Sequence, residues 1–479
     1  MNPILPIAAT IFAASCLASH AQDKPYADTS STTDEFVKSE MAKRHMPGLS
    51  LAVIREGKPV KVQGYGLANV ELNVQVKPDT IFQIQSMTKQ FTATAIMMLV
   101  EEGKVGLDDK ISKYLDGTPD TWKEVTVRRL LTHTSGIKDF INEPVASLRL
   151  DVTEEEVLKQ TAPRPLNFPV GDKYSYCNTG YHLLGMIVHK VSGKTWGEFV
   201  EERICKPLGM NDTHVYSQQT VIPNRASGYR YSDGKLYNGE FIASSILAYA
   251  GGGLTSTVND LCKWDAALYT EKVLKKSSLD QMWTSGLLND GRKAGYGFGW
   301  AVGVSHGHRF QEHSGAHMTG FTSHILRYPD DKITIVVLTN LSGANPGAIA
   351  RGVANIYVPG IFSPRALAAK PDPDAARHAR ITQFMEDVAK GATTSASYAP
   401  GLNAALDDDD RRDMSAHIKA KRSFDFLESL DVHDLNMERN GSPIQTTCFY
   451  RLVTDANEIW HYRFWLTSDG LIADYSDRE

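Results

Sequence analysis

The stretch that decides the fold is "FQIQSMTKQFTATAI", which runs from Phe82 to Ile96. Its apolar pattern predicts the start of an amphipathic helix, with Ser86 at the opening and Lys89 one turn later. Residues at positions i and i+3 lie on one face of a helix, and this face is expected to enter the protein interior. A buried lysine is unfavourable unless it has partners or a chemical role. The rest of the chain is expected to supply one or the other.

The Ser–Lys spacing is typical of an activated serine. A serine hydroxyl is a poor nucleophile until a base takes its proton. A lysine whose pKa is lowered by burial can act as that base, or can hold another base deprotonated. The spacing alone is a weak signal, because it recurs at Ser232 and Lys235. There it straddles Asp233-Gly234, which predicts a turn with nothing to bury.

Two further stretches complete an ordered set of motifs. "YSYCNTGY" (174–181) contains Tyr176-Cys177-Asn178, and "QEHSGAHMTGF" (311–321) contains His313-Ser314-Gly315 on a predicted strand. The order Ser-x-x-Lys, Tyr-x-Asn, His/Lys-Ser/Thr-Gly resembles the penicillin-recognising serine hydrolases. That family includes class C β-lactamases, serine-type D-Ala-D-Ala carboxypeptidases, D-aminopeptidases and related esterases. Further stretches resemble the family too, so that the resemblance covers residues 35 to 360: "RLLTHTSGI" (129–137), "PLGMNDT" (207–213), "GGGLTSTVNDLCKW" (251–264) and "YGFGW" (296–300).

The resemblance implies a role for each residue of the first two motifs. Ser86 attacks a carbonyl and becomes acylated, while Lys89 lies beside it and keeps the site electropositive. Tyr176, with a pKa lowered by nearby cations, is implied as general base and later returns a proton to the leaving group. Whether Tyr176 or Lys89 takes the first proton stays open. Asn178 is implied to hydrogen-bond both the substrate amide and Lys89.

The third motif is implied to form the other side of the site. The backbone N–H groups of Ser86 and Ala316 would form the oxyanion hole, and Gly315 would let the strand approach the substrate closely. His313 and Ser314 belong to the substrate-binding set. Class C β-lactamases carry a lysine at the position of His313, which attracts the β-lactam carboxylate. A histidine is mostly neutral at pH 7 unless a partner raises its pKa, so D-peptide hydrolases and esterases are the closer match.

These features predict an enzyme that cleaves an amide or ester of a small molecule or peptide through an acyl-enzyme on Ser86. The alternative is a penicillin-binding or ligand-capturing homologue with little or no turnover. No cofactor is expected. His306, His308, His313, His317 and His324 offer possible metal ligands, but neither an HExxH motif nor a suitably spaced acid accompanies them. An α/β-hydrolase is disfavoured because no Gly-x-Ser-x-Gly motif occurs.

Composition and the N-terminal segment limit the classes to which the protein can belong. With 479 residues, 42% hydrophobic residues and a net charge of -5, the chain is typical of a globular protein and not of a nucleic-acid binder. Residues 1–21 are apolar from Ile4 to about Ala18 and end in "SHA", which predicts a signal peptide and export to the periplasm or medium. Cys16 offers a lipoprotein alternative, but "AASC" lacks the usual large aliphatic residue. No later segment is expected to span a membrane. The sequence does not specify the oligomeric state.

Strand and helix patterns predict the architecture. Strands near both ends of residues 22–364, with helices between them, predict one sheet built from both ends. The resemblance implies an α/β (α+β) β-lactamase-like fold, in which an antiparallel sheet is flanked by helices and joined by a helical subdomain. Residues 365–380 are rich in Ala and Pro and predict a linker. Residues 381–479 predict a small α+β domain, in which Trp460, Tyr462, Phe464 and Leu466 share one strand face.

Overall fold

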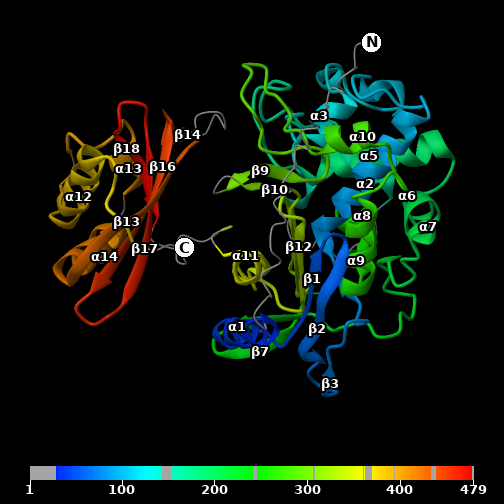
Figure 1. Ribbon diagram of the computed structural model, residues 1–479. Coiled ribbons are helices and arrows are strands. Elements are labelled where there is room, and N and C mark those ends of the chain that lie inside the picture. The colour runs from blue at the N-terminus through cyan, green and yellow to red at the C-terminus, as the bar shows by residue number, and fades with distance from the viewer. Residues whose placement is uncertain are drawn as a thin grey trace, which may run out of the picture.

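The computed structural model describes residues 29–142, 153–240, 245–305, 308–359, 361, 369–392, 394–406, 408–432 and 438–476. The predicted signal peptide therefore lies outside the described residues. Two units are visible: a main unit (described residues up to 361) and a C-terminal unit (369–476) (Figure 1). Across the described residues, no helix combines the length and apolar character needed to cross a membrane.

A seven-stranded antiparallel sheet forms the centre of the main unit, with the order β3-β2-β1-β12-β11-β10-β9. Its strands are β1 (Gly48–Arg55), β2 (Lys58–Asn69), β3 (Val74–Gln75), β9 (Ala301–Ser305), β10 (His308–His317), β11 (Phe321–Tyr328) and β12 (Ile333–Thr339).

The pairing of β1 with β12 closes this sheet. The register runs from Leu49 opposite Thr339 to Arg55 opposite Ile333, so strands from the two ends of the main unit lie side by side (Figure 1). Both strands are buried along almost their whole length, which explains their continuous apolar sequences. The prediction of one sheet made from both ends is confirmed.

Helices cover both faces of the sheet. Helices α1 (Thr29–Lys43) and α11 (Pro346–Tyr357) pack together over one face, and α2 (Thr88–Glu101) and α9 (Val258–Ala267) lie on the other (Figure 1). The remaining helices of the main unit lie beyond α2 and form the predicted helical subdomain: α3 (Val127–Leu131), α4 (Glu154–Thr161), α5 (Asn178–Ser192), α6 (Trp196–Val200), α7 (Lys206–Leu208), α8 (Ser245–Gly252) and α10 (Lys276–Met282).

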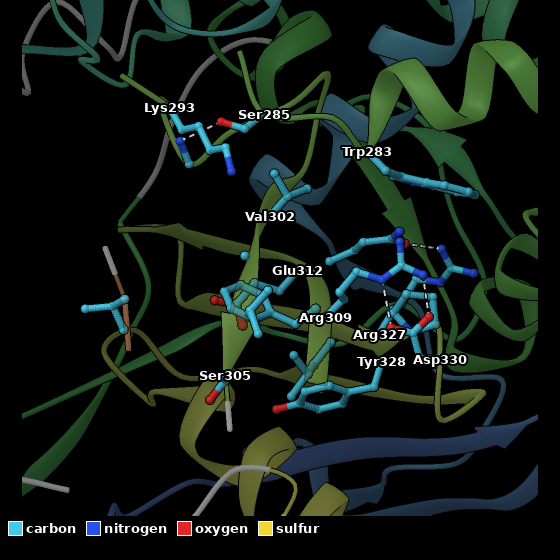
Figure 2. Close-up of a pocket in the computed structure, with 18 of the residues that line it drawn as sticks. Trp283, Ser285, Lys293, Val302, Ser305, Arg309, Glu312, Arg327, Tyr328 and Asp330 are labelled. Atoms are coloured by element: carbon cyan, nitrogen blue, oxygen red, sulfur yellow. Dashed lines mark hydrogen bonds and ion pairs between the residues drawn. The ribbon is translucent and has the colours of Figure 1, made fainter. Parts of the chain in front are cut away.

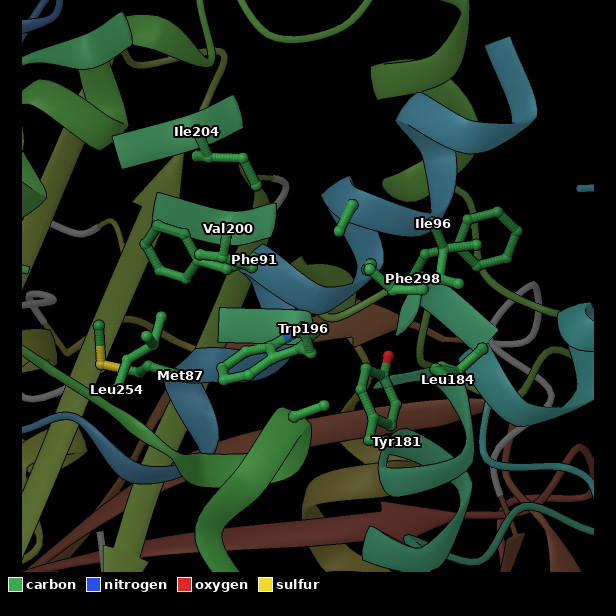
Figure 3. Close-up of a cluster of buried hydrophobic side chains, with 14 of the residues drawn as sticks. Met87, Phe91, Ile96, Tyr181, Leu184, Trp196, Val200, Ile204, Leu254 and Phe298 are labelled. Atoms are coloured by element: carbon green, nitrogen blue, oxygen red, sulfur yellow. The ribbon is translucent and has the colours of Figure 1, made fainter. Parts of the chain in front are cut away.

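Helix α2 is the centre of the largest hydrophobic core. Figure 3 shows Phe91 and Ile96 of this helix among side chains from α5 and α6. Two of its polar side chains are hydrogen-bonded inside the core: the Trp264 Nε1–H donates to Gln90 Oε1 over 2.9 Å, and Thr92 Oγ1 donates to the Ala250 carbonyl over 2.6 Å. Because α2 is enclosed on all sides, its first turn is held in a fixed position.

The C-terminal unit is a four-stranded antiparallel sheet covered by helices on one face (Figure 1). Trp460, Tyr462, Phe464 and Leu466 face this helical side, as predicted. Helix α12 begins at Ala375, inside the segment predicted as a linker, so the helical part starts before residue 381. The elements are α12 (Ala375–Ala389), α13 (Leu402–Ala405), α14 (Asp408–Lys419), β13 (Lys421–Asp431), β14 (Glu438–Arg439), β15 (Ser442–Pro443), β16 (Thr446–Thr454), β17 (Ile459–Leu466) and β18 (Ile472–Ser476).

A buried ion pair ties α9 to the sheet. The Arg327 side chain is 1% exposed and the Asp265 side chain is fully buried, and Arg327 Nε donates to Asp265 Oδ1 over 2.7 Å. Arg327 also donates to Gln311 over 2.6 Å, and Thr334 Oγ1 donates to Asp265 over 2.8 Å. Strands β10, β11 and β12 therefore share one polar network with the helix.

Replacing Arg327 with Met should strongly destabilise the main unit, because it leaves the Asp265 carboxylate buried without its cation. We expect a loss of about 3–5 kcal/mol in the free energy of unfolding, measured by urea denaturation. Lys190→Met provides the control, since the exposed pair of Lys190 with Asp116 should contribute less than about 1 kcal/mol. Equal losses in the two variants would contradict the assigned role of the buried pair.

Candidate active site

Ser86 and Lys89 come together at the first turn of α2. Ser86 lies in a single 3₁₀ turn (Gln85–Met87), and the α-helix proper begins at Thr88, two residues later than predicted. Lys89 is completely buried, and its Nζ lies 3.1 Å from Ser86 Oγ. The i, i+3 spacing thus places the ammonium group beside the hydroxyl, on the face of the turn that enters the interior.

Two fixed acceptors hold the other side of the lysine. Lys89 Nζ donates to Asn178 Oδ1 over 2.8 Å and to the Gly251 carbonyl over 2.7 Å. Burial lowers the pKa of Lys89 to about 7, while the negative charge of Asp139 acts in the opposite direction. The amine is therefore present in both its charged and its neutral form near neutral pH.

Asp139 orients Asn178. Its Oδ2 atom accepts hydrogen bonds from the Asn178 backbone N–H over 2.9 Å and from the side-chain Nδ2 over 2.8 Å. These contacts fix the amide with its Oδ1 toward Lys89, at the first residue of α5. Sequence reasoning missed both Asp139 and the Gly251 carbonyl. A single sequence offers no signal that separates Asp139 from the other acids among the chain's 56 Asp and Glu residues.

Tyr176 lies beside this pair but does not have the predicted acidity. Lys89 Nζ lies over the face of the Tyr176 ring, 4.7 Å from its centroid, and the His133 ring packs 4.3 Å away. The prediction that nearby cations lower the pKa of Tyr176 is wrong. Removal of its hydroxyl from water raises the pKa well above the usual value, although 36% of the residue stays exposed, and the hydrogen bond with Ser86 offsets this only in part.

His133 and Cys177 support the loop that carries Tyr176. His133 Nδ1 accepts the backbone N–H of Cys177 over 3.1 Å. The Cys177 thiol lies 3.2 Å from the Ile137 carbonyl, and burial raises its pKa to about 12. A thiol of this kind stays protonated and unreactive, so Cys177 acts in packing.

His313 is buried against tyrosine and is neutral. Its Nε2 lies 2.8 Å from the Tyr296 hydroxyl, and its Nδ1 lies 2.7 Å from the Ser314 carbonyl. A carbonyl only accepts, so Nδ1 carries the proton and Nε2 accepts from Tyr296. Burial lowers the pKa of His313 to about 3, and the charge of Lys89 acts in the same direction. His313 therefore cannot replace the positively charged lysine of class C β-lactamases near neutral pH.

The packing of the protein itself requires glycine at position 315. A Cβ atom there would lie 2.2 Å from the Ile84 carbonyl and 2.5 Å from Ser323 Oγ. Glycine thus permits a close approach between β10 and the turn before Ser86, while its approach to a substrate stays a prediction. The approach of β10 to this turn places the third motif directly beside the first one.

A cavity of about 160 Å³ opens over Ser86. Of the predicted site residues, Ser86, Tyr176, Asn178 and Ala316 line it, while Lys89, His313, Ser314 and Gly315 do not. The remaining lining residues are Gln85, Phe140, Ile141, His182, Tyr249, Gly251, Gly252 and His317. No lysine or arginine is among the described residues of this lining, and burial lowers the pKa of both lining histidines, that of His182 to about 4. The cavity therefore presents neutral groups above Lys89.

The other histidines of the metal hypothesis have separate partners. His308 contacts Asp331 over 2.8 Å and His324 contacts Glu312 over 3.2 Å, whereas His306 lies outside the described residues. Within the described ranges, no three His, Cys, Asp or Glu residues are arranged to hold a metal ion. The second Ser-x-x-Lys pair lies in the predicted turn, between β6 (Tyr229–Ser232) and β7 (Lys235–Asn238).

Comparisons with known proteins place this site in a family. Residues 33–357 match the Beta-lactamase family. A penicillin-binding protein of Bacillus subtilis (strain 168) is 31% identical over 294 residues, which are 58% of this chain and 64% of that protein. Protein flp of Staphylococcus aureus (strain N315) is 28% identical over 327 residues, or 66% of this chain and 64% of that protein. The chain thus spans less than two thirds of the length of either relative.

Solved structures agree with these matches. The octameric penicillin-binding protein homologue from Pyrococcus abyssi has a TM-score of 0.63 and 25% identity, covering 92% of this chain and 96% of its own. The D-amino acid amidase from Ochrobactrum anthropi SV3, in complex with D-phenylalanine, has a TM-score of 0.60 and 26% identity, covering 69% of this chain and 99% of its own. The Pyrococcus protein covers 92% of this chain, whereas the amidase covers 69%, so the likeness to the Pyrococcus protein extends into the C-terminal unit. Because the family match takes in the whole main-unit sheet and all three motifs around Ser86, the chain belongs to the Beta-lactamase family.

Proposed function

We propose that this chain is an exported serine hydrolase that cleaves an amide or ester bond through an acyl-enzyme on Ser86. One observation carries the proposal: Lys89 Nζ lies 3.1 Å from Ser86 Oγ in a buried site where the pKa of Lys89 is lowered to about 7. A base at this distance with a pKa near neutrality can take the hydroxyl proton and generate the nucleophile.

Lys89 is the better general base of the two candidates. Asn178 Oδ1 and the Gly251 carbonyl accept two of its N–H groups, so a neutral amine would direct its lone pair toward Ser86. Tyr176, with its raised pKa, keeps its proton at neutral pH and serves as a hydrogen-bond donor instead. We therefore propose Lys89 as the first base, a choice that the motifs alone left open.

The reaction would proceed in two steps, acylation of Ser86 and hydrolysis of the acyl-enzyme. Lys89 takes the proton of Ser86 as Oγ forms a bond with the substrate carbonyl carbon, and the backbone N–H groups of Ser86 and Ala316 would stabilise the oxyanion. The bond to the leaving group breaks as its nitrogen or oxygen takes the proton from Lys89, with Tyr176 placed to assist that transfer. Water then adds to the acyl ester with Lys89 again as the base, and the acid leaves as Oγ regains a proton.

The cavity favours a small, neutral acyl group. Its volume of about 160 Å³ lies below the range of roughly 300–1,000 Å³ that is usual for drug-sized ligands. Phe140, Ile141 and Tyr249 give it apolar walls, and neutral His313 supplies no charge for a carboxylate. The likeness to a D-amino acid amidase supports an amide or ester of a small D-amino acid over a β-lactam as the substrate.

A ligand-capturing protein is the second candidate. Two relatives carry the name penicillin-binding protein or penicillin-binding protein homologue, which favours a stable adduct as the alternative outcome. Turnover separates the two functions, because an enzyme releases more than one equivalent of product and a capturing protein stops at one. Export rests on the apolar leader in residues 1–21, and N-terminal sequencing of the secreted protein would test cleavage before Gln22.

Ser86 should be the site of a transient covalent adduct. Intact-protein mass spectrometry over time, with D-phenylalanine amide, a small activated ester and a penicillin, should show an adduct that decays with product release. Ser86→Ala should show no adduct, while Ser232→Ala, which changes the exposed Ser-x-x-Lys pair, should behave as the wild type. An adduct that persists on Ser86→Ala would place the chemistry elsewhere. An adduct on the wild type that never decays would favour capture.

The activity should depend on a group that titrates near pH 7. Below this pH Lys89 is protonated and cannot accept the Ser86 proton, so kcat/KM should fall about tenfold per pH unit. Lys89→Met should reduce kcat by about 100-fold or more and remove this acidic limb. If Tyr176 were the base instead, the limb would lie above pH 10, and that result would reject the assignment of Lys89.

Asp139→Asn should lower the rate and move the acidic limb to lower pH. The negative charge of Asp139 raises the pKa of Lys89, so its removal should lower that pKa further. The pH profile of kcat/KM measures this shift, which a purely structural defect would not produce. Asp172→Asn is the matched control, because Asp172 contacts Asn289 instead of the Lys89 network. If the rate fell while the acidic limb of the kcat/KM profile stayed at the same pH, Asp139 would be assigned a role in folding alone.

A further inference from the structure

Tyr176 lies on an irregular stretch of chain at the edge of the catalytic site. Residues 173–177 form neither helix nor strand, and Tyr174, Ser175 and Tyr176 are all exposed. Tyr174 lines a cavity of about 1830 Å³, whose wall Figure 2 shows in part with Trp283 and Val302. Exposed side chains contribute little packing, so the backbone of this stretch depends on hydrogen-bond partners from the side that faces the interior.

His133 supplies such partners on both sides of Tyr176. Its backbone carbonyl accepts the N–H of Ser175 over 2.9 Å, and its Nδ1 atom accepts the N–H of Cys177 over 3.1 Å. The residues immediately before and after Tyr176 are therefore bound to one and the same residue. These two hydrogen bonds fix the backbone of Tyr176 relative to the turn that contains His133.

The ring of His133 also packs against the ring of Tyr176. The two ring centroids lie 4.3 Å apart, and the ring planes differ by 36°. The His133 ring is in turn in contact with Tyr181 and Tyr296, at centroid distances of 5.0 Å and 4.6 Å. The Tyr181 hydroxyl donates to a backbone carbonyl over 2.9 Å, and the Tyr296 hydroxyl lies 2.8 Å from His313 Nε2. His133 is therefore a fixed support for the Tyr176 side chain as well as for its backbone.

The conformation and the protonation of His133 explain why a histidine stands here. Its φ of 56° lies in the left-handed region, which Asn, Asp and His adopt more readily than other residues with a Cβ atom. Because Nδ1 accepts, the proton is on Nε2, and this buried N–H has no hydrogen-bond partner among the residues that the structure describes. Burial lowers the pKa of His133 well below its usual value, so the ring is neutral and Nδ1 keeps its lone pair. A side chain kept for packing alone would not carry an unpaired N–H into the interior, so the acceptor at Nδ1 accounts for the histidine.

We propose that His133 is a positioning residue, which holds the Tyr176 hydroxyl at Ser86 so that Tyr176 can protonate the leaving group. The Tyr176 hydroxyl hydrogen-bonds with Ser86, and Lys89 Nζ lies 4.7 Å from the Tyr176 ring centroid. The proposal rests on the function proposed above and adds the residue that fixes its proton donor.

The place of this hydroxyl matters in the step that expels the leaving group. The C–N bond of an amide breaks with its electron pair on nitrogen, and the nitrogen takes the proton of Tyr176. Lys89, which carries the proton taken from Ser86, then gives that proton to the Tyr176 oxygen. An activated ester needs no such donor, because its leaving group departs as a stable anion. A misplaced hydroxyl should therefore slow the cleavage of amides and affect activated esters far less.

Two substrates with the same acyl group test this inference: D-phenylalanine amide and the p-nitrophenyl ester of D-phenylalanine. His133→Phe keeps an aromatic ring but removes the acceptor, and it should lower kcat for the amide about 100-fold while changing kcat for the ester far less. KM should stay unchanged, because His133 does not line the cavity over Ser86. His133→Asn keeps an acceptor and tolerates a positive φ, so it should recover part of the amide rate. His133→Gln, whose acceptor lies one bond further out, replaces His133→Phe if that variant does not fold.

A double-mutant cycle separates positioning from a general loss of structure. Tyr176→Phe removes the hydroxyl, so adding His133→Phe to it should cause no further loss of rate on the amide. Losses that multiply in the double variant would assign His133 to folding alone and overturn the proposal, as would equal losses on amide and ester. His308→Phe is the matched control, because His308 contacts Asp331 and should leave the ratio of amide to ester rates unchanged.

Crystallography of His133→Phe gives a measurement that does not depend on turnover. The Tyr176 hydroxyl should lie about 1 Å or more further from Ser86 than in the wild-type protein, a displacement large enough to explain the expected loss of rate. An unchanged position of the hydroxyl would overturn the proposal even if neither substrate were hydrolysed. A displaced Tyr176 in a protein whose wild type hydrolyses neither substrate would uphold the role of His133 and reject only the function proposed above.

Discussion

The structure depends on the burial of one lysine at the start of α2. Lys89 is enclosed completely, and three oxygen atoms, of Ser86, Asn178 and Gly251, surround its Nζ. Enclosure removes water, which lowers the pKa of the amine from 10.5 to about 7. Between these two values the unfolded chain binds more protons than the folded one, so the contribution of Lys89 to the free energy of unfolding rises with pH. The burial that makes Lys89 a reactive base therefore reduces the free energy of unfolding near neutral pH.

The sequence predicts the parts of the site that depend on local spacing. The i, i+3 positions of Ser86 and Lys89 guarantee their contact once a helical turn forms, and the alternation along β17 predicts which aromatic residues enter the C-terminal core. One sheet made from both ends of the main unit was predictable from strand patterns, whereas its antiparallel arrangement was implied by the family resemblance. These features depend on neighbours within a few residues or on the period of a single element.

Features that arise from distant contacts were not predictable in this way. Asp139 reaches Asn178 across 39 positions, and the Gly251 carbonyl reaches Lys89 across 162. The direction of the pKa shift of Tyr176 was predicted wrongly because the shift depends chiefly on the loss of water at its hydroxyl, which only the folded site reveals. The burial of His313 against Tyr296 follows from the approach of β10 to the Ser86 turn, which only the folded sheet reveals.

The pairing of β1 with β12 also governs how the protein must fold. Leu49 and Thr339 are partners, so the central pair of strands forms only after nearly the entire main unit has been synthesised. Contacts of such long sequence separation slow folding, and until then the hairpin of β1 and β2 presents an apolar edge that is prone to association. The low pKa of Lys89 likewise exists only after α5 and α8 have closed around it. Reactivity is therefore acquired late, as a property of the completed chain, and a partly made chain carries an ordinary lysine and an inert serine.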